Sequence, residues 1–234
     1  YTAEMKRTMM GPTVLHGKYL VALGSADPEL LAKSETALRA DIAAANRLSA
    51  LGVIFHPASH RGQGFEAIID QFAASVRKVL DSEPGDSLLM LETSAGAGDH
   101  IGSSFAELGT LIKAIGNDRV AVCLDTQHVF AAGYNIAVTD TLNVAIDEFD
   151  KEIGIGLLKA VHANDSMREL GSSVDRHENI GDGLIGTAGF TTIMSHEAFK
   201  RVPFYLEVPG TGKSGPDKPN LDRLKAIRSQ VGAG

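Results

Sequence analysis

The sequence predicts an α/β barrel of the TIM type, with about six of the eight strand–helix units present in this chain. Short apolar runs alternate with longer amphipathic stretches, which is typical of parallel strands joined by helices. The runs show little apolar–polar alternation, as in strands that are buried on both faces. Each run also leads directly into a His, Asp or Glu, and in such barrels the carboxyl ends of the strands form the active-site face.

The predicted strands cover residues 13–15, 53–55, 88–91, 120–124, 157–161 and 204–206. The predicted helices cover residues 28–51, 65–80, 104–115 and 139–153, with a further helix at 3–10 before the first strand. Gly52 stands where a glycine often ends a helix. No repeat, low-complexity tract or long linker divides the chain, so we expect residues 1–234 to form one partial barrel domain.

Cysteine usage and hydropathy limit the classes of protein. Cys123 is the one cysteine of the chain and lies in an apolar run, so we expect a buried side chain and exclude a disulfide framework. No run of 18 apolar residues is present, which excludes a membrane span and predicts no membrane partner. The sequence favours a reducing, cytoplasmic location, or a nuclear one in a eukaryote.

The formal net charge of −7 argues at first against a nucleic-acid partner, because phosphate binding usually needs a basic surface. Bound metal weakens this objection. Three divalent zinc ions would bring the formal charge to −1, so the charge leaves the question open.

The residues that end the runs form two candidate metal-binding groups. One contains His16, His56 and Glu92, and the other contains Glu92, Asp125, His162 and Glu207. Imidazole and carboxylate ligands suit zinc or manganese. A lone histidine is more often a satisfied core residue than a ligand, but a suitable ligand after all six runs is improbable by chance.

Two loop motifs strengthen this interpretation. Asp125 and His128 lie three residues apart just after a strand, and Asp175 and His177 form a D-x-H pair. If the backbone of this pair is extended, both side chains point the same way and can reach one ion. Taken alone, the D-x-H pair could equally lie in a solvated loop.

Several segments together resemble the signature segments of the endonuclease IV family, in the family's order. They are FHPASH at 55–60, LETSAG at 91–96, DTQHVFAAGY at 125–134, HANDS at 162–166, DRH at 175–177 and LEVP at 206–209. The resemblance implies nine ligands for three zinc ions. His16, His56 and Glu92 would hold the first ion, Glu92, Asp125, His162 and Glu207 the second, and His128, Asp175 and His177 the third.

The resemblance further implies a monomeric DNA-repair enzyme that acts on double-stranded DNA and cuts 5′ to an abasic site. Glu92, Asp125 and Glu207 would be the catalytic residues, and Mn²⁺ could replace zinc at one site. Tyr19 and Leu20 match residues that press into the minor groove, although ordinary packing could also explain them. Gln127 stands where the family often has Cys, but no ligand position is lost.

Two other functions stay open. A metal-dependent sugar isomerase or epimerase on a related barrel would share ligands at the strand ends but would not require the third set. A non-enzymatic DNA- or metal-binding relative is expected to have lost ligands.

The run before His16 matches the family's third strand. We therefore expect that two strand–helix units are absent, and that the chain is a fragment or has its open sheet edges covered by another chain.

Overall fold

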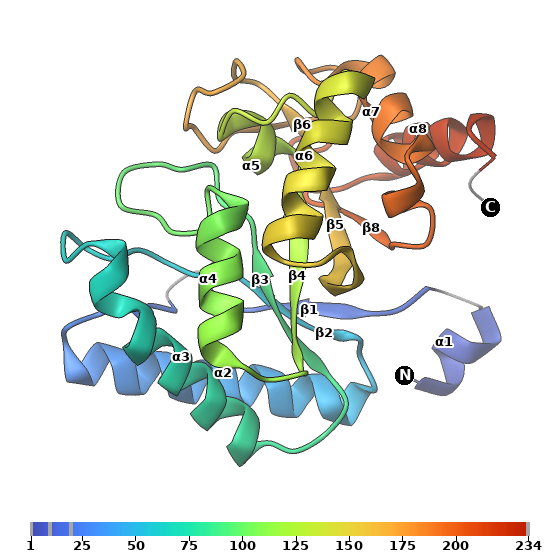
Figure 1. Cartoon of the computed structure of the whole chain (residues 1–234). Coiled ribbons are helices and arrows are strands. Elements are labelled where there is room, and N and C mark those ends of the chain that lie inside the picture. Colours follow the sequence, from blue (N-terminus) through green and yellow to red (C-terminus); the bar gives the residue numbers. More distant parts are fainter. Residues whose placement is uncertain (1, 9–10, 19–20, 233–234) are drawn as a thin grey trace.

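The computed structural model describes residues 2–8, 11–18 and 21–232. Six parallel strands form one sheet in the order β1-β2-β3-β4-β5-β8 (Figure 1). The α/β fold of the TIM type and its six strands are therefore confirmed. The strands are β1 (Val14–His16), β2 (Gly52–Phe55), β3 (Leu88–Glu92), β4 (Val120–Asp125), β5 (Leu158–Ala163) and β8 (Phe204–Leu206).

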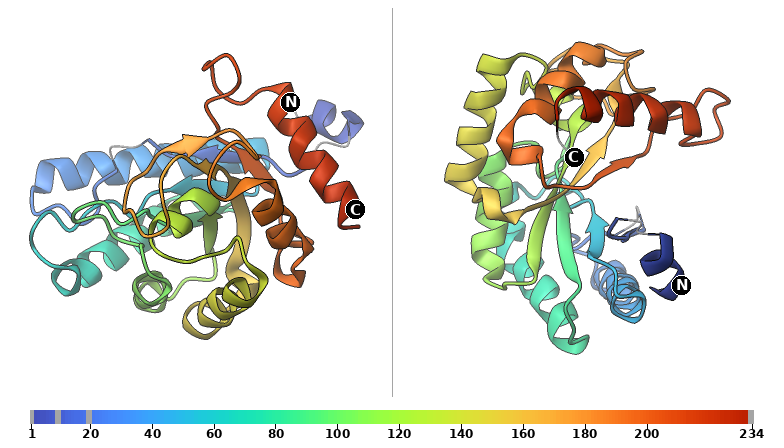
Figure 2. Two further views of the ribbon diagram at one scale, coloured as in Figure 1. Left: turned by 90° about the horizontal axis from the view of Figure 1, so that it is seen from above. Right: turned by 90° about the vertical axis from the view of Figure 1, so that its right-hand side faces the viewer.

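Helices follow one another in an arc outside the sheet (Figure 2). The main ones are α2 (Pro28–Leu48), α3 (Phe65–Ser82), α4 (Phe105–Ile115), α6 (Thr139–Glu152), α7 (Gly186–Ser195) and α8 (Lys218–Gln230). Shorter elements are α1 (Thr2–Thr8), α5 (Thr126–Ala131), η1 (Ile155–Leu157) and η2 (Glu197–Phe199). A two-stranded antiparallel ribbon joins β6 (Asp165–Ser166) to β7 (His177–Glu178).

Local sequence signals fix where the helices begin and end. Asp27, Ser104 and Asp217 are N-caps whose side chains accept a hydrogen bond from a backbone N–H of the first turn. Gly116 ends α4 in the left-handed conformation. These signals give each helix a defined length, so that the next strand starts in register.

The predicted end of the helix at residues 28–51 is wrong. The helix ends at Leu48, and Ser49 is its C-cap, with a left-handed φ of 52°. Gly52 is not a cap but the first residue of β2. A Cβ at this position would lie 2.3 Å from the carbonyl oxygen of Leu88, so the glycine is needed because two strands approach closely.

Gly52→Ala is expected to destabilise the protein by about 2 kcal/mol or more, because the added methyl group can be accommodated only by shifting β2 away from β3. The free energy of unfolding from urea titration measures the effect. Gly11→Ala is the control, since a Cβ there meets no atom of the described residues within 4 Å. Equal stability of the two variants would contradict this account.

Side chains of the strands alternate between two sides of the sheet. One side packs under the helices and contributes to the main core, with Val53, Phe55 and Leu91 as members. The other faces the barrel interior, where a smaller cluster fills the space: Ile54, Met90, Ala121, Cys123 and Ala160. The predicted burial of Cys123 is confirmed.

The sheet is open among the described residues, since its end strands β1 and β8 each pair with one neighbour. Tyr205 of β8 packs against the interior cluster, and its hydroxyl donates a 2.6 Å hydrogen bond to the carbonyl oxygen of Pro12. This contact connects the two ends of the sheet. Among the described residues, no helix is long and apolar enough to cross a membrane.

Candidate metal centre

The sequence-predicted ligands gather at the carboxyl ends of the strands. His16, Glu92 and Asp125 are the last residues of β1, β3 and β4, and His162 lies near the end of β5. His56 and Glu207 directly follow β2 and β8. The other three lie on segments that follow β4 and β5: His128 in α5, Asp175 in a loop and His177 in β7.

Glu92 occupies the centre of the cluster and is fully buried. Its Oε2 lies 3.0 Å from His16 Nε2 and 3.5 Å from His56 Nε2. Its Oε1 lies 2.7 Å from His162 Nδ1. The two oxygens of one carboxylate therefore face two different sets of ligands.

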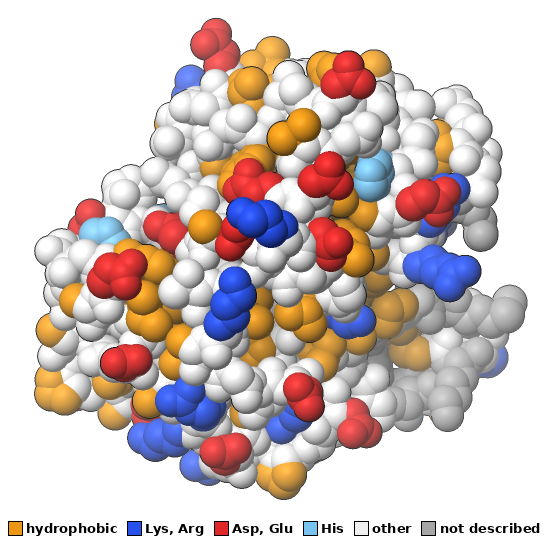
Figure 3. All heavy atoms as spheres, in the orientation of Figure 1, with side chains coloured by type: hydrophobic (Ala, Val, Ile, Leu, Met, Phe, Trp, Pro, Cys, Tyr) orange, Lys and Arg blue, Asp and Glu red, His pale blue; other side chains and the backbone are white. Residues whose placement is uncertain are grey.

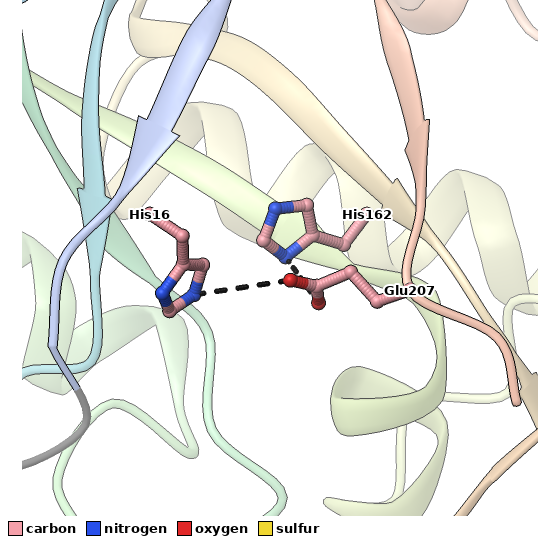
Figure 4. A group of neighbouring side chains, drawn as sticks. All are labelled: His16, His162 and Glu207. Atoms are coloured by element: carbon pink, nitrogen blue, oxygen red, sulfur yellow. Dashed lines mark ion pairs between the residues drawn. The ribbon is translucent and has the colours of Figure 1, made fainter. Parts of the chain in front are cut away.

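The second set surrounds Glu207. Figure 4 shows the imidazoles of His16 and His162 directed at this carboxylate from β1 and β5. His162 Nδ1 lies 3.0 Å from Glu207 Oε2, and His16 Nε2 lies 4.0 Å from Glu207 Oε1. One possible ligand atom from each of Glu92, Asp125, His162 and Glu207 lies within 4.8 Å of the others. The grouping of His16 with His162 and Glu207 is a contact that the sequence did not predict.

The third set is arranged around Asp175. Its Oδ2 lies 3.4 Å from His128 Nε2, and its Oδ1 lies 3.2 Å from His177 Nε2. The group at this point whose ligand atoms all lie within 4.8 Å of one another instead combines His128 and His177 with Asp125. Two carboxylates thus approach the same pair of imidazoles, one buried and one half-exposed.

Backbone carbonyls fix the orientation of two imidazoles. His128 Nδ1 donates to the carbonyl of Thr93 at 2.8 Å, and His16 Nδ1 donates to the carbonyl of Gly17 at 2.8 Å. Nε2 of each ring is thereby left to face a carboxylate. Metal-binding histidines usually have this arrangement, in which the remote N–H is held by the protein.

Asn164 is a functional residue that sequence reasoning missed. It is fully buried, and its Nδ2 donates to Asp125 Oδ2 at 2.6 Å while its Oδ1 accepts from the backbone N–H of Glu207 at 3.0 Å. One amide thus holds two carboxylate residues from different strands. Asn164 follows His162 by two residues, so the period of an extended strand could have placed both side chains on one side.

A cavity of about 530 Å³ opens beside the cluster, and His56, His128 and Asp175 form part of its wall. Ala58, Arg61 and Ser173 also line it, and all three have a positive φ that non-glycine residues rarely adopt. Backbone strain of this kind often marks binding and catalytic sites. Tyr19 and Leu20, predicted to contact DNA, lie outside the described residues.

Comparisons with known proteins identify the family. The profile of the family described as "Xylose isomerase-like TIM barrel" matches residues 3–230. "Probable endonuclease 4" of Halothermothrix orenii is 39% identical over 216 residues, covering 92% of this chain and 77% of that protein. The chain belongs to the endonuclease IV family. This membership confirms the resemblance and the prediction that the chain is an enzyme.

Solved structures agree with membership in the endonuclease IV family. Endonuclease IV from Thermus thermophilus superposes with a TM-score of 0.80 at 31% identity, covering all of this chain and 80% of that one. A D-tagatose 3-epimerase-like protein gives a TM-score of 0.75 at 18% identity, covering 98% of this chain and 81% of that one. The second similarity shows a shared fold alone.

The charges of this endonuclease IV family member fit a cluster that binds metal. Burial raises the pKa of Glu92, but His162 and His16 outweigh it and hold that pKa well below its ordinary value. Burial lowers the pKa of His128, but Asp125, Asp175 and Glu92 together raise it to about 10. A metal ion binds the neutral form of an imidazole, so it would replace any proton held at these nitrogens.

His177 gives the clearest indication that the cluster suits a metal ion. Its Nε2 is buried and has no hydrogen-bond partner among the described residues, yet it lies near the oxygens of Asp175 and Asp125. An imidazole nitrogen beside two carboxylates without a hydrogen bond suits an ion placed between them. The residues of all three sets therefore fit divalent metal ions.

Proposed function

We propose that this chain is a zinc-dependent endonuclease that hydrolyses the phosphodiester 5′ to an abasic site in double-stranded DNA. The products would be a 3′-hydroxyl and a 5′-deoxyribose phosphate. The proposal includes three zinc ions per monomer, with Mn²⁺ able to replace zinc at one site. The ligands are His16, His56, Glu92, Asp125, His162, Glu207, His128, Asp175 and His177.

The main support for this proposal is the position of the Glu92 side chain. Its two oxygens face His16 and His56 on one side and His162 on the other, so this one carboxylate would serve as a ligand in both sets. Paired metal ions a few ångströms apart are typical of enzymes that cleave phosphodiesters. Family membership links this geometry to DNA cleavage.

The residues of the chain have defined roles in this proposal. Glu92, Asp125 and Glu207 would hold the paired ions, and Asn164 keeps the last two of these residues in place. When bound, zinc supplies positive charge for the phosphoryl oxygens and lowers the pKa of water toward neutrality. We assign no separate general base.

In this proposal the DNA contact lies at the metal centre, for an electrostatic reason. The face seen in Figure 3 mixes acidic, basic and hydrophobic side chains and has no continuous basic patch. The chain's formal charge of −7 would also repel phosphate without bound cations. The cavity beside His56 and Asp175 is where an extruded sugar without a base would bind, since such a nucleotide loses little stacking on leaving the helix.

Metal analysis combined with a cleavage assay tests the proposal. Zinc-loaded protein should contain about three ions per chain and cut a duplex with a single abasic site, leaving a 3′ end that a polymerase can extend. An undamaged duplex is the control. Activity on a ketose sugar without cleavage of abasic DNA would favour the isomerase alternative and overturn the proposal.

Asn164→Ala is expected to weaken zinc binding at the second site by about 10- to 100-fold, because Asp125 and the backbone of Glu207 lose their shared support. Competition with a chelating dye measures this affinity. Asn46→Ala is the matched control, since Asn46 also bridges backbone groups, at Pro84 and Ser87, and these precede β3, at the opposite end of that strand from Glu92. Equal zinc affinity in both variants would remove the role assigned to Asn164.

A further inference from the structure

Asp175 has the least support of the nine ligands from regular structure. It lies in the irregular segment 167–176, and its side chain is 45% exposed. His128 and His177, by contrast, lie in α5 and β7. The distance between Asp175 and His128 therefore depends on what holds this loop.

Three hydrogen bonds attach the loop to α5 and its C-terminal end. The backbone N–H of Gly171 donates to the carbonyl of Phe130 at 3.1 Å, and that of Ser173 donates to the carbonyl of Ala131 at 2.9 Å. The third contact comes from a side chain, because Gln127 Nε2 donates to the carbonyl of Val174 at 2.9 Å. Val174 directly precedes Asp175, so Gln127 holds the peptide next to the ligand.

Gln127 is a buried amide with one polar atom left unsatisfied by the described residues. The side chain is fully buried, and its Oε1 has no hydrogen-bond partner among the described residues. An unpartnered buried carbonyl destabilises a fold. The loop that Gln127 holds is also strained, since Ser173 has a φ of 53°. A strained loop fixed by a buried amide is typical of a site that is built before its ligand arrives.

We propose that Gln127 is a positioning residue for the third metal ion, which it serves by fixing Asp175 opposite His128. Gln127 directly precedes His128 in α5, so one turn of helix carries a ligand and also the group that places a second ligand. A cysteine at this position, where the family often has one, would be shorter and a weaker donor. The inference rests on the proposed three-metal site.

The test removes the donor while keeping the volume of the side chain. Gln127→Met should weaken binding of the third zinc ion by about tenfold or more and leave the other two unchanged, measured with Zn²⁺ alone against a series of chelators. Gln127→Asn keeps the amide but is one methylene too short to reach Val174, and it should show the same selective loss. Gln127→Asn therefore tests the inference even if Gln127→Met does not fold.

Gln71→Met is the matched control. Gln71 Nε2 likewise donates to two loop carbonyls, those of Leu23 and Ser25, in a loop that carries no metal ligand. This variant should keep all three ions. Unchanged binding of three ions in both Gln127 variants, or an equal loss of all three, would overturn the inference. Absence of zinc from the unsubstituted protein would instead refute the proposed function.

Discussion

Glu92→Ala is expected to lower kcat/KM on an abasic duplex by about 10³-fold or more, whereas His177→Ala should lower it by about 10- to 100-fold. Glu92 faces both His162 and the pair His16 and His56, so its loss disturbs two ions and their separation. His177 belongs to the third set only, and its nearest carboxylate is that of Asp175. Steady-state kinetics with zinc-saturated protein measures both effects.

Glu169→Ala is the control for removal of a carboxylate, because Glu169 is exposed in the loop after β6. It should retain the activity of the unsubstituted protein. Thermal unfolding of each variant separates a catalytic loss from a folding loss. Similar kcat/KM values for Glu92→Ala and His177→Ala, in variants that remain folded, would contradict the bridging role of Glu92.

Removal of metal is expected to lower Tm by about 20 °C. Each ion present at a hundred times its Kd stabilises the folded state by about 2.7 kcal/mol. In a chain of this size, 1 kcal/mol corresponds to about 2–4 °C. The physical reason is that Glu92 and Asp125 are fully buried carboxylates that need positive charge beside them.

Calorimetry of chelator-treated protein, before and after addition of zinc, measures the shift. Addition of Mg²⁺ instead of zinc is the control, because imidazole ligands select against that ion. Recovery with zinc alone is the expected outcome. Equal Tm values for the chelated and zinc-loaded protein would mean that these residues do not form resident metal sites.

Most of the fold could be predicted because its signals are local. The run at 120–124 and the helix at 104–115 are visible in hydropathy and capping residues, and the structure has β4 and α4 there. The function of Gly52 could not be predicted. A side chain at this position would collide with the carbonyl of Leu88, which is 36 positions away in the sequence and comes close only when β2 pairs with β3.

Six ligand positions followed from one rule, that parallel strands end at the same edge of the sheet, whereas His128, Asp175 and His177 came from loop motifs and from the family resemblance. That rule placed His16 and Glu207 at the same edge although almost the whole chain separates them, but it did not predict that the two side chains approach each other. It could not identify Gln127 or Asn164. The functions of these residues depend on single hydrogen bonds to Val174 and Asp125, and amide side chains carry no metal-binding signal of their own.

The chemical make-up of the cluster has a consequence for its durability. All nine proposed ligand side chains present nitrogen or oxygen, and the one cysteine is buried, with burial raising the pKa of its thiol to about 12. Peroxides attack thiolates, which is how many zinc sites built on cysteine lose their ion. The proposed centre has no sulfur ligand through which such oxidation could release its ion.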